Sequence, residues 1–155
     1  MMDEFKTKVA VASLVPHKGK MLLLDRICNY DLDRKSITSE IDISCDSMFY
    51  DKEFGGVPVW VAFEFMAQSI SALSGICARA KALLNGRPSA LPKLGFVVSV
   101  HGFEAEIPAF KAGKTVTVWV QETTRVDEAV TFEGCASVGG VVAVTARINT
   151  VEVEK

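Results

Sequence analysis

Short runs of alternating apolar and polar residues occur near the N-terminus and again through the C-terminal half of the chain. Within 115–121, threonines alternate with valines, which is the period of two expected of a strand with one buried face. Polar residues at 31–34 and the pair Gly139 and Gly140 interrupt such runs and predict two hairpin turns. We predict strands over 21–31, 35–45, 93–107, 114–125, 128–138 and 141–153.

The segment between the two groups of strands, 57–84, is apolar on nearly every side of a helix. Glu64 is the only charged residue in its first 22 positions. Pro58 suits a first helical turn, and Asn85 followed by Gly86 suits a helix end. Hydropathy alone would also allow a membrane span, but polar and small residues dilute the segment and both flanks lack basic or aromatic anchors. We therefore predict one long buried central helix and no membrane span.

The composition favours one compact domain over 1–155. The 155 residues are 49% hydrophobic, with no repeat or linker, and a chain of this length is typical of a single core. Seventeen Lys and Arg against nineteen Asp and Glu give a net charge of −2, so no general cationic surface would attract nucleic acid. Residues 1–20 contain no long apolar run. We expect a helix or loop there and a cytoplasmic protein.

The cysteine pattern indicates neither a disulfide framework nor a metal site. Cys28, Cys45, Cys77 and Cys135 are widely spaced, and the chain has only two histidines. We expect four reduced, structural thiols and no bound metal.

Four positions form a polar line down one face of the predicted helix: Glu64, Gln68, Ser71 and Gly75. The residues around Glu64 are mostly apolar and aromatic. We expect them to shield its carboxyl from water, which favours the protonated form that a general acid needs. We take Glu64 as a candidate acid/base. The alternative is a structural role, either at the end of the helix or in a pair with an arginine such as Arg26.

The start of the predicted helix offers a second element. Backbone N–H groups at the first positions of a helix have no partner within it, and the positive end of the helix dipole lies there. The amides of Val59 and Trp60 could therefore hold a thioester carbonyl as it gains negative charge.

The two histidines differ in their setting. His17 lies in a predicted loop beside two lysines, and it is either a surface group or a site residue. His101 lies within a predicted strand, where a structural role is expected.

Three motifs, in the same order along the chain, resemble bacterial 3-hydroxyacyl-[acyl-carrier-protein] dehydratases. LVPHKGKMLLLDRI is similar to their opening segment, and VPVWVAFEFMAQ to their central-helix motif. LGFVVSVHGFEAEIPAFKAGKTVTV is similar to their third strand and the following Pro-x-x-Pro-Gly loop. The resemblance implies an α+β hot-dog fold, in which an antiparallel sheet of about six strands wraps one long helix. It also implies dimers that share a continuous sheet.

The resemblance carries over to particular residues. Glu64 falls on the family's catalytic carboxylate, Gln68 on the glutamine that follows it, and Val59 on a glycine whose N–H contacts the thioester carbonyl. The family's catalytic histidine normally lies fourteen residues before the carboxylate, and here that position is Tyr50. The chain resembles a dehydratase-like branch that lacks this histidine, found beside polyene and fatty-acid synthesis enzymes and sometimes as half of a heterodimer.

Dehydration needs a base for the proton beside the carbonyl and an acid for the departing hydroxyl. Glu64 can fill one role at a time, so a second group is required. We assign His17 to it by exclusion, because histidine changes charge near neutrality. Tyr50 can donate a hydrogen bond, but a phenol is a poor base.

We predict a 3-hydroxyacyl-thioester dehydratase that releases water to give a 2-enoyl thioester in fatty-acid or polyene synthesis. Its predicted catalytic residues are Glu64 and His17, and its predicted substrate-binding residues are Val59, Trp60, Gln68 and Tyr50. The resemblance implies no cofactor beyond the phosphopantetheine of an acyl carrier protein. It also implies a homodimer or higher homo-oligomer, or a heterodimer with a related dehydratase. The alternatives are a non-catalytic acyl-binding subunit of a heteromeric dehydratase and an acyl thioesterase.

Overall fold

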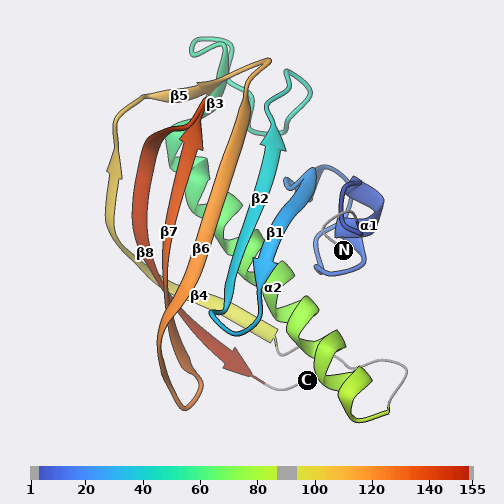
Figure 1. Cartoon of the computed structure of the whole chain (residues 1–155). Coiled ribbons are helices and arrows are strands. Elements are labelled where there is room, and N and C mark those ends of the chain that lie inside the picture. The colour runs from blue at the N-terminus through green and yellow to red at the C-terminus, as the bar shows by residue number, and fades with distance from the viewer. Residues whose placement is uncertain (1–3, 87–93, 154–155) are drawn as a thin grey trace.

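The computed structural model describes residues 4–86 and 94–153. The helical elements are α1 (Lys8–Ala12), η1 (Gly19–Met21), η2 (Val59–Val61) and α2 (Ala62–Leu84). The strands are β1 (Arg26–Asp31), β2 (Ser36–Asp42), β3 (Gly56–Pro58), β4 (Leu94–Ala105), β5 (Ala109–Lys111), β6 (Thr115–Val126), β7 (Ala129–Val138) and β8 (Val141–Val153). Figure 1 shows the large sheet curled around α2, with α1 beside β1 and the small β3/β5 ribbon near the start of α2.

The large sheet has six antiparallel strands in the order β1-β2-β6-β7-β8-β4. The predicted alternation on β6 is confirmed, since Val116, Val118 and Val120 are fully buried while the intervening residues are not. The turn between β7 and β8 uses Gly139 and Gly140, both at positive φ, where glycine has no steric cost. The predicted hot-dog fold, with one long helix inside a six-stranded sheet, is confirmed.

Two predicted boundaries are wrong. The strand expected over 21–31 begins only at Arg26, because the backbone before it bonds elsewhere: the Leu23 N–H donates to a helix side chain. The helix expected from 57 begins as α2 at Ala62, after a short strand and a 3-10 turn. That strand, β3, pairs with β5, which the sequence pattern did not predict.

Helix α2 is buried on two faces. One face packs against the large sheet; its fully or nearly fully buried residues are Ala62, Phe65, Met66, Ser69, Ala72, Leu73 and Ile76. The other face carries Gln68 and Gly75, seven residues apart, and lies against the N-terminal segment. Val59–Leu84 is long and apolar enough to cross a membrane, but 56% of its most apolar window is buried within the fold, as in a core helix.

The N-terminal segment is anchored to the C-terminal half of α2 by two contacts. The Arg79 guanidinium donates 2.9 Å hydrogen bonds to the carbonyl oxygen and the hydroxyl of Ser13. One turn earlier on the helix, Gly75 lets the Leu14 backbone approach so closely that a Cβ would lie 2.6 Å from its carbonyl oxygen. These contacts place the loop that follows α1 along the helix.

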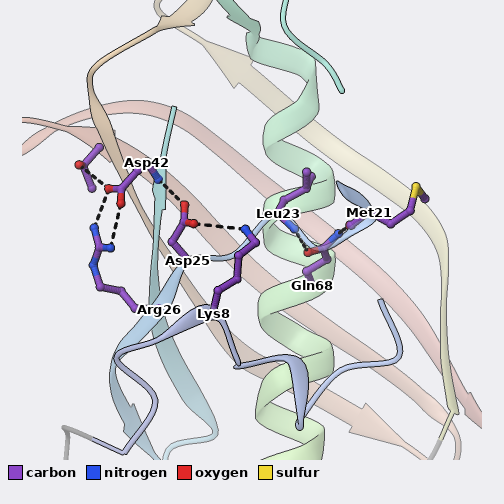
Figure 2. A network of polar contacts seen from close by, with 8 residues as sticks. Lys8, Met21, Leu23, Asp25, Arg26, Asp42 and Gln68 are labelled. Atoms are coloured by element: carbon purple, nitrogen blue, oxygen red, sulfur yellow. Dashed lines mark hydrogen bonds and ion pairs between the residues drawn. The ribbon is translucent and has the colours of Figure 1, made fainter. Parts of the chain in front are cut away.

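A second set of contacts attaches α1 to the sheet (Figure 2). The Lys8 ammonium pairs with Asp25 at 3.2 Å, and the other Asp25 oxygen accepts from the Asp42 N–H at 2.7 Å. The Arg26 guanidinium donates two hydrogen bonds to the Asp42 carboxylate, which lowers the pKa of Asp42. The segment between α1 and β1 is therefore fastened at both ends.

We expect Gly75→Ala to destabilise the protein. In a helix interior this change would ordinarily add about 1 kcal/mol of stability. Here the new methyl group would overlap the Leu14 carbonyl, and overpacking costs about 1–3 kcal/mol. Urea unfolding should show a lower midpoint than wild type, whereas Ser74→Ala, at the neighbouring half-buried position, should not. A higher midpoint for Gly75→Ala would show that the two backbones do not lie this close.

Candidate active site

The structure brings Glu64 and His17 together from distant parts of the chain. Glu64 lies in the first turn of α2, and His17 lies in the loop between α1 and η1. The His17 Nε2 atom is 3.6 Å from the Glu64 Oε1 atom, and the two side chains are 25% and 28% exposed. The pair therefore borders solvent on one side, where a substrate can reach it.

The buried Gln68 side chain, 1% exposed, holds this arrangement. Its Oε1 accepts from the Leu23 N–H and its Nε2 donates to the Met21 carbonyl, both at 2.8 Å (Figure 2). Its Nε2 also lies 3.3 Å from the Glu64 Oε1 atom. One side chain thus connects the helix, the N-terminal segment and the candidate catalytic carboxylate.

The orientation of the Gln68 amide follows from its backbone partners. An N–H can only donate and a carbonyl oxygen can only accept, so the amide oxygen faces Leu23 and the amide nitrogen faces Met21. The second hydrogen of that nitrogen is then available to Glu64.

The structure decides between the two structural readings of Glu64. Its pairing with Arg26 is wrong, because that guanidinium binds Glu40 and Asp42. Its position near a helix end is confirmed, since α2 begins at Ala62. The carboxylate is 28% exposed and lies beside the Gln68 amide nitrogen, rather than being enclosed by its apolar neighbours as expected from the sequence.

The expected pair of free amides at the helix start is reduced to one. The Val59 N–H donates to the Pro108 carbonyl at 3.0 Å, continuing the pairing of β3 with β5, so the prediction that it is free is wrong. The Trp60 N–H finds no acceptor among the described residues. Trp60 is 53% exposed, and its ring contacts those of Phe49 and Phe63, with centroids 5.8 and 6.3 Å away.

Tyr50 and His101 do not join the pair. Tyr50 lies in the loop before β3, where its N–H donates to the Ser47 carbonyl, and its hydroxyl makes no hydrogen bond within residues 4–86 and 94–153. His101 is exposed on the edge strand β4, and its structural role stays a prediction.

A cavity of about 260 Å³ lies beside the site. It is open to solvent on one side and shares Leu23 with the Gln68 contact. Its lining comes from α1, the segment before β1, the end of β2 and the start of α2, and it includes the charged residues Lys8, Lys20, Asp25, Asp42 and Asp46. Its apolar lining consists of Leu22, Leu23, Ile41, Ile43, Met48, Val57 and Phe65. This gives apolar space close to the turn that carries Glu64.

The four cysteines are free thiols. Burial raises the pKa of Cys28, Cys77 and Cys135, which disfavours the reactive thiolate and fits structural roles. The described residues contain no group of three or more His, Cys, Asp or Glu side chains placed to hold a metal ion.

A six-stranded antiparallel sheet around one long helix, with a carboxylate and a histidine at the helix start, defines a hot-dog protein with a candidate acid/base site. The family model of the ApeP-like proteins, described as ApeP dehydratase, matches residues 9–155, and the chain belongs to this family. The resemblance to dehydratases predicted from three motifs is confirmed.

Individual relatives agree with this placement. A chain of the dehydratase heterocomplex ApeI:P from Xenorhabdus doucetiae is 27% identical, with a TM-score of 0.78 over 94% of this chain and 91% of that chain. The 3-hydroxyacyl-[acyl-carrier-protein] dehydratase FabZ of Chlamydia trachomatis serovar L2 is 30% identical over 69 residues, or 43% of this chain. The match spans 45% of that relative, so the chain covers about half the length of the curated relatives it matches.

The fold is also shared with proteins whose sequences are much less similar. A hypothetical thioesterase from Streptococcus pneumoniae TIGR4, solved with coenzyme A, has a TM-score of 0.61 over 84% of this chain and 86% of that chain. Its sequence is 8% identical, so this likeness shows the fold alone.

We expect Gln68→Leu to detach the segment that carries His17. The change leaves the buried Leu23 N–H without an acceptor, which costs about 1–3 kcal/mol. Urea unfolding should show the loss, and hydrogen exchange at the Leu23 amide should become faster. Gln121→Leu is the control, because its amide makes one 3.4 Å hydrogen bond to the Arg34 carbonyl. Unchanged exchange at Leu23 would contradict the anchoring role.

Proposed function

We propose that the protein is a dehydratase subunit that removes water from 3-hydroxyacyl thioesters. The observation that carries the proposal is the contact between Glu64 and His17, two acid/base side chains at the start of the central helix of an ApeP-like family member. Dehydration requires proton transfer to and from the substrate, and a carboxylate beside an imidazole can support it.

The other proposed contacts surround this pair. The Trp60 N–H is a candidate donor to the thioester carbonyl as negative charge develops on it. The apolar residues of the cavity, together with the exposed Trp60 and the half-buried Phe63, provide surface for an acyl chain. Tyr50 and Gln68 remain proposed substrate neighbours, and Gln68 also has the structural role described above. The chemistry needs no cofactor beyond the arm that carries the substrate.

We propose that the substrate is delivered on the phosphopantetheine of an acyl carrier protein in the cytoplasm, because the FabZ relative is named for an acyl-carrier-protein substrate.

We also propose that the chain pairs with a second hot-dog subunit. Strand β4 lies at one edge of the large sheet and exposes apolar side chains. One face of α2 is likewise covered only in part; it consists of Phe63, Ala67, Ile70 and Ser74. The ApeI:P relative is a heterocomplex, which favours a related dehydratase as the partner.

A non-catalytic acyl-binding subunit is the second candidate. It is favoured by the same heterocomplex and by Tyr50 at the position where the resembling enzymes carry histidine. An acyl thioesterase is the third candidate, on the fold likeness alone.

Hydration of a 2-enoyl carrier-protein substrate, the reverse reaction, tests the proposal. It should be measured with the protein alone and after mixing with a dehydratase encoded beside it. We expect Glu64→Gln to lower the rate by about 10²-fold or more, because general acid/base catalysis contributes this much. Circular dichroism should show an intact fold.

Glu133→Gln is the matched control, since Glu133 is an exposed residue that pairs with Arg147 at 3.5 Å. Activity that appears only in the mixture and is unaffected by Glu64→Gln would identify an acyl-binding subunit. Release of free thiol from an acyl thioester, without hydration, would identify a thioesterase.

A further inference from the structure

The two ring nitrogens of His17 lie in different environments. Nε2 faces the Glu64 Oε1 atom at 3.6 Å, a separation that substrate can shorten. Nδ1 is buried and has no hydrogen-bond partner within residues 4–86 and 94–153, although the side chain as a whole is 25% exposed. Because Nδ1 is enclosed by this chain itself, a partner subunit cannot supply the missing partner.

This asymmetry selects one tautomer. A proton on Nδ1 would be a buried donor without an acceptor, which carries its full desolvation penalty. A proton on Nε2 points to a carboxylate oxygen, whereas a lone pair there would face negative charge. The imidazolium form needs a proton on both nitrogens and so includes the buried orphan donor. Of the two neutral tautomers, the geometry favours the one with its proton on Nε2.

The two oxygens of the Glu64 carboxylate also lie in different environments. Its Oε1 lies 3.3 Å from the Gln68 amide nitrogen and also faces the His17 Nε2. The backbone at Leu23 and Met21 determines the orientation of that amide. Its Oε2 has no hydrogen bond to the described residues. Oε1 therefore accepts one hydrogen bond, from Gln68, and has the His17 Nε2 just beyond hydrogen-bond distance, whereas Oε2 is left for the substrate.

We infer that Glu64 performs both proton transfers through Oε2 and that His17 is a positioning residue, which donates from Nε2 to Oε1 and never changes its protonation. This inference rests on the proposed dehydratase function. It reverses the expectation that His17 supplies the second acid/base group. It also removes the need for any histidine at position 50.

The reaction balances with one carboxylate. Oε2 of ionised Glu64 takes the proton from C2, and the C–H electron pair passes into the thioester as an enolate. That pair then forms the C2=C3 double bond while the C3–O bond breaks. The leaving oxygen takes the proton back from Oε2 and departs as water. Glu64 is again ionised, and His17 has lost and gained nothing.

Nitrogen-15 NMR of the full chain tests the state of His17 independently of activity. The protein contains two histidines, so the variant His101→Gln leaves one imidazole to observe. We expect long-range proton–nitrogen couplings at pH 7 to show a neutral ring protonated at Nε2. A ring protonated at Nδ1, or at both nitrogens, would overturn the inference even if the protein proves to be a dehydratase.

Kinetics of two His17 variants test the division of roles, in whichever assembly shows hydration. Glutamine offers an N–H at this position but cannot carry a proton, and leucine offers neither. We expect His17→Gln to retain kcat within about tenfold of wild type and His17→Leu to lose more than that. A proton-transferring histidine would instead make both variants fall by about 10²- to 10⁴-fold, and that result would refute the inference.

The outcomes for the two proposals are separable. Absence of hydration by the wild-type assembly refutes the proposed function, whatever the tautomer of His17. Hydration that is lost equally in Glu64→Gln and His17→Gln, with both variants folded, supports the function and refutes the single-carboxylate mechanism.

Discussion

The buried amide of Gln68 is the interaction on which the rest of the site depends. It satisfies the backbone of the N-terminal segment at Leu23 and Met21 and faces the carboxylate of Glu64 with its remaining hydrogen. A buried amide is costly unless its hydrogen bonds are made, so the segment and the helix stabilise each other's position. His17 lies on that segment, and its distance from Glu64 is a consequence of this mutual attachment.

The second face of α2 explains how a small fold can carry chemistry on a mostly apolar helix. The sheet covers one face, and an irregular segment covers the other, held at three points along the helix by Gln68, Gly75 and Arg79. The Leu14 backbone can lie this close to the helix only because Gly75 has no side chain. The polar contacts on either side of Gly75 fix the position of the segment along the helix. His17 therefore lies on a segment that is packed and hydrogen-bonded against α2, which suits a group that positions a carboxylate.

Most of the fold could be predicted from the sequence, because the two periodicities are local properties. Strands β2, β4, β6, β7 and β8 lie close to the predicted ranges, and the central helix is where its apolar run placed it. The errors have tertiary causes. Leu23 bonds to a side chain instead of a strand, and Val59 bonds to Pro108 across a ribbon whose second strand is only three residues long. The sequence around Leu23 does not indicate Gln68 as its partner, and the sequence around Val59 does not indicate Pro108.

The sequence by itself determined the fold class, the buried helix and the choice of Glu64, since one carboxylate in a long apolar helix stands out without any structure. It also named His17, but only by exclusion. Only the tertiary structure decided that His17 reaches Glu64, that Val59 has no free amide and that the two ring nitrogens of His17 differ. The physical reason is that each of these depends on contacts between residues far apart in the chain, and hydrophobic periodicity carries no information about such distances.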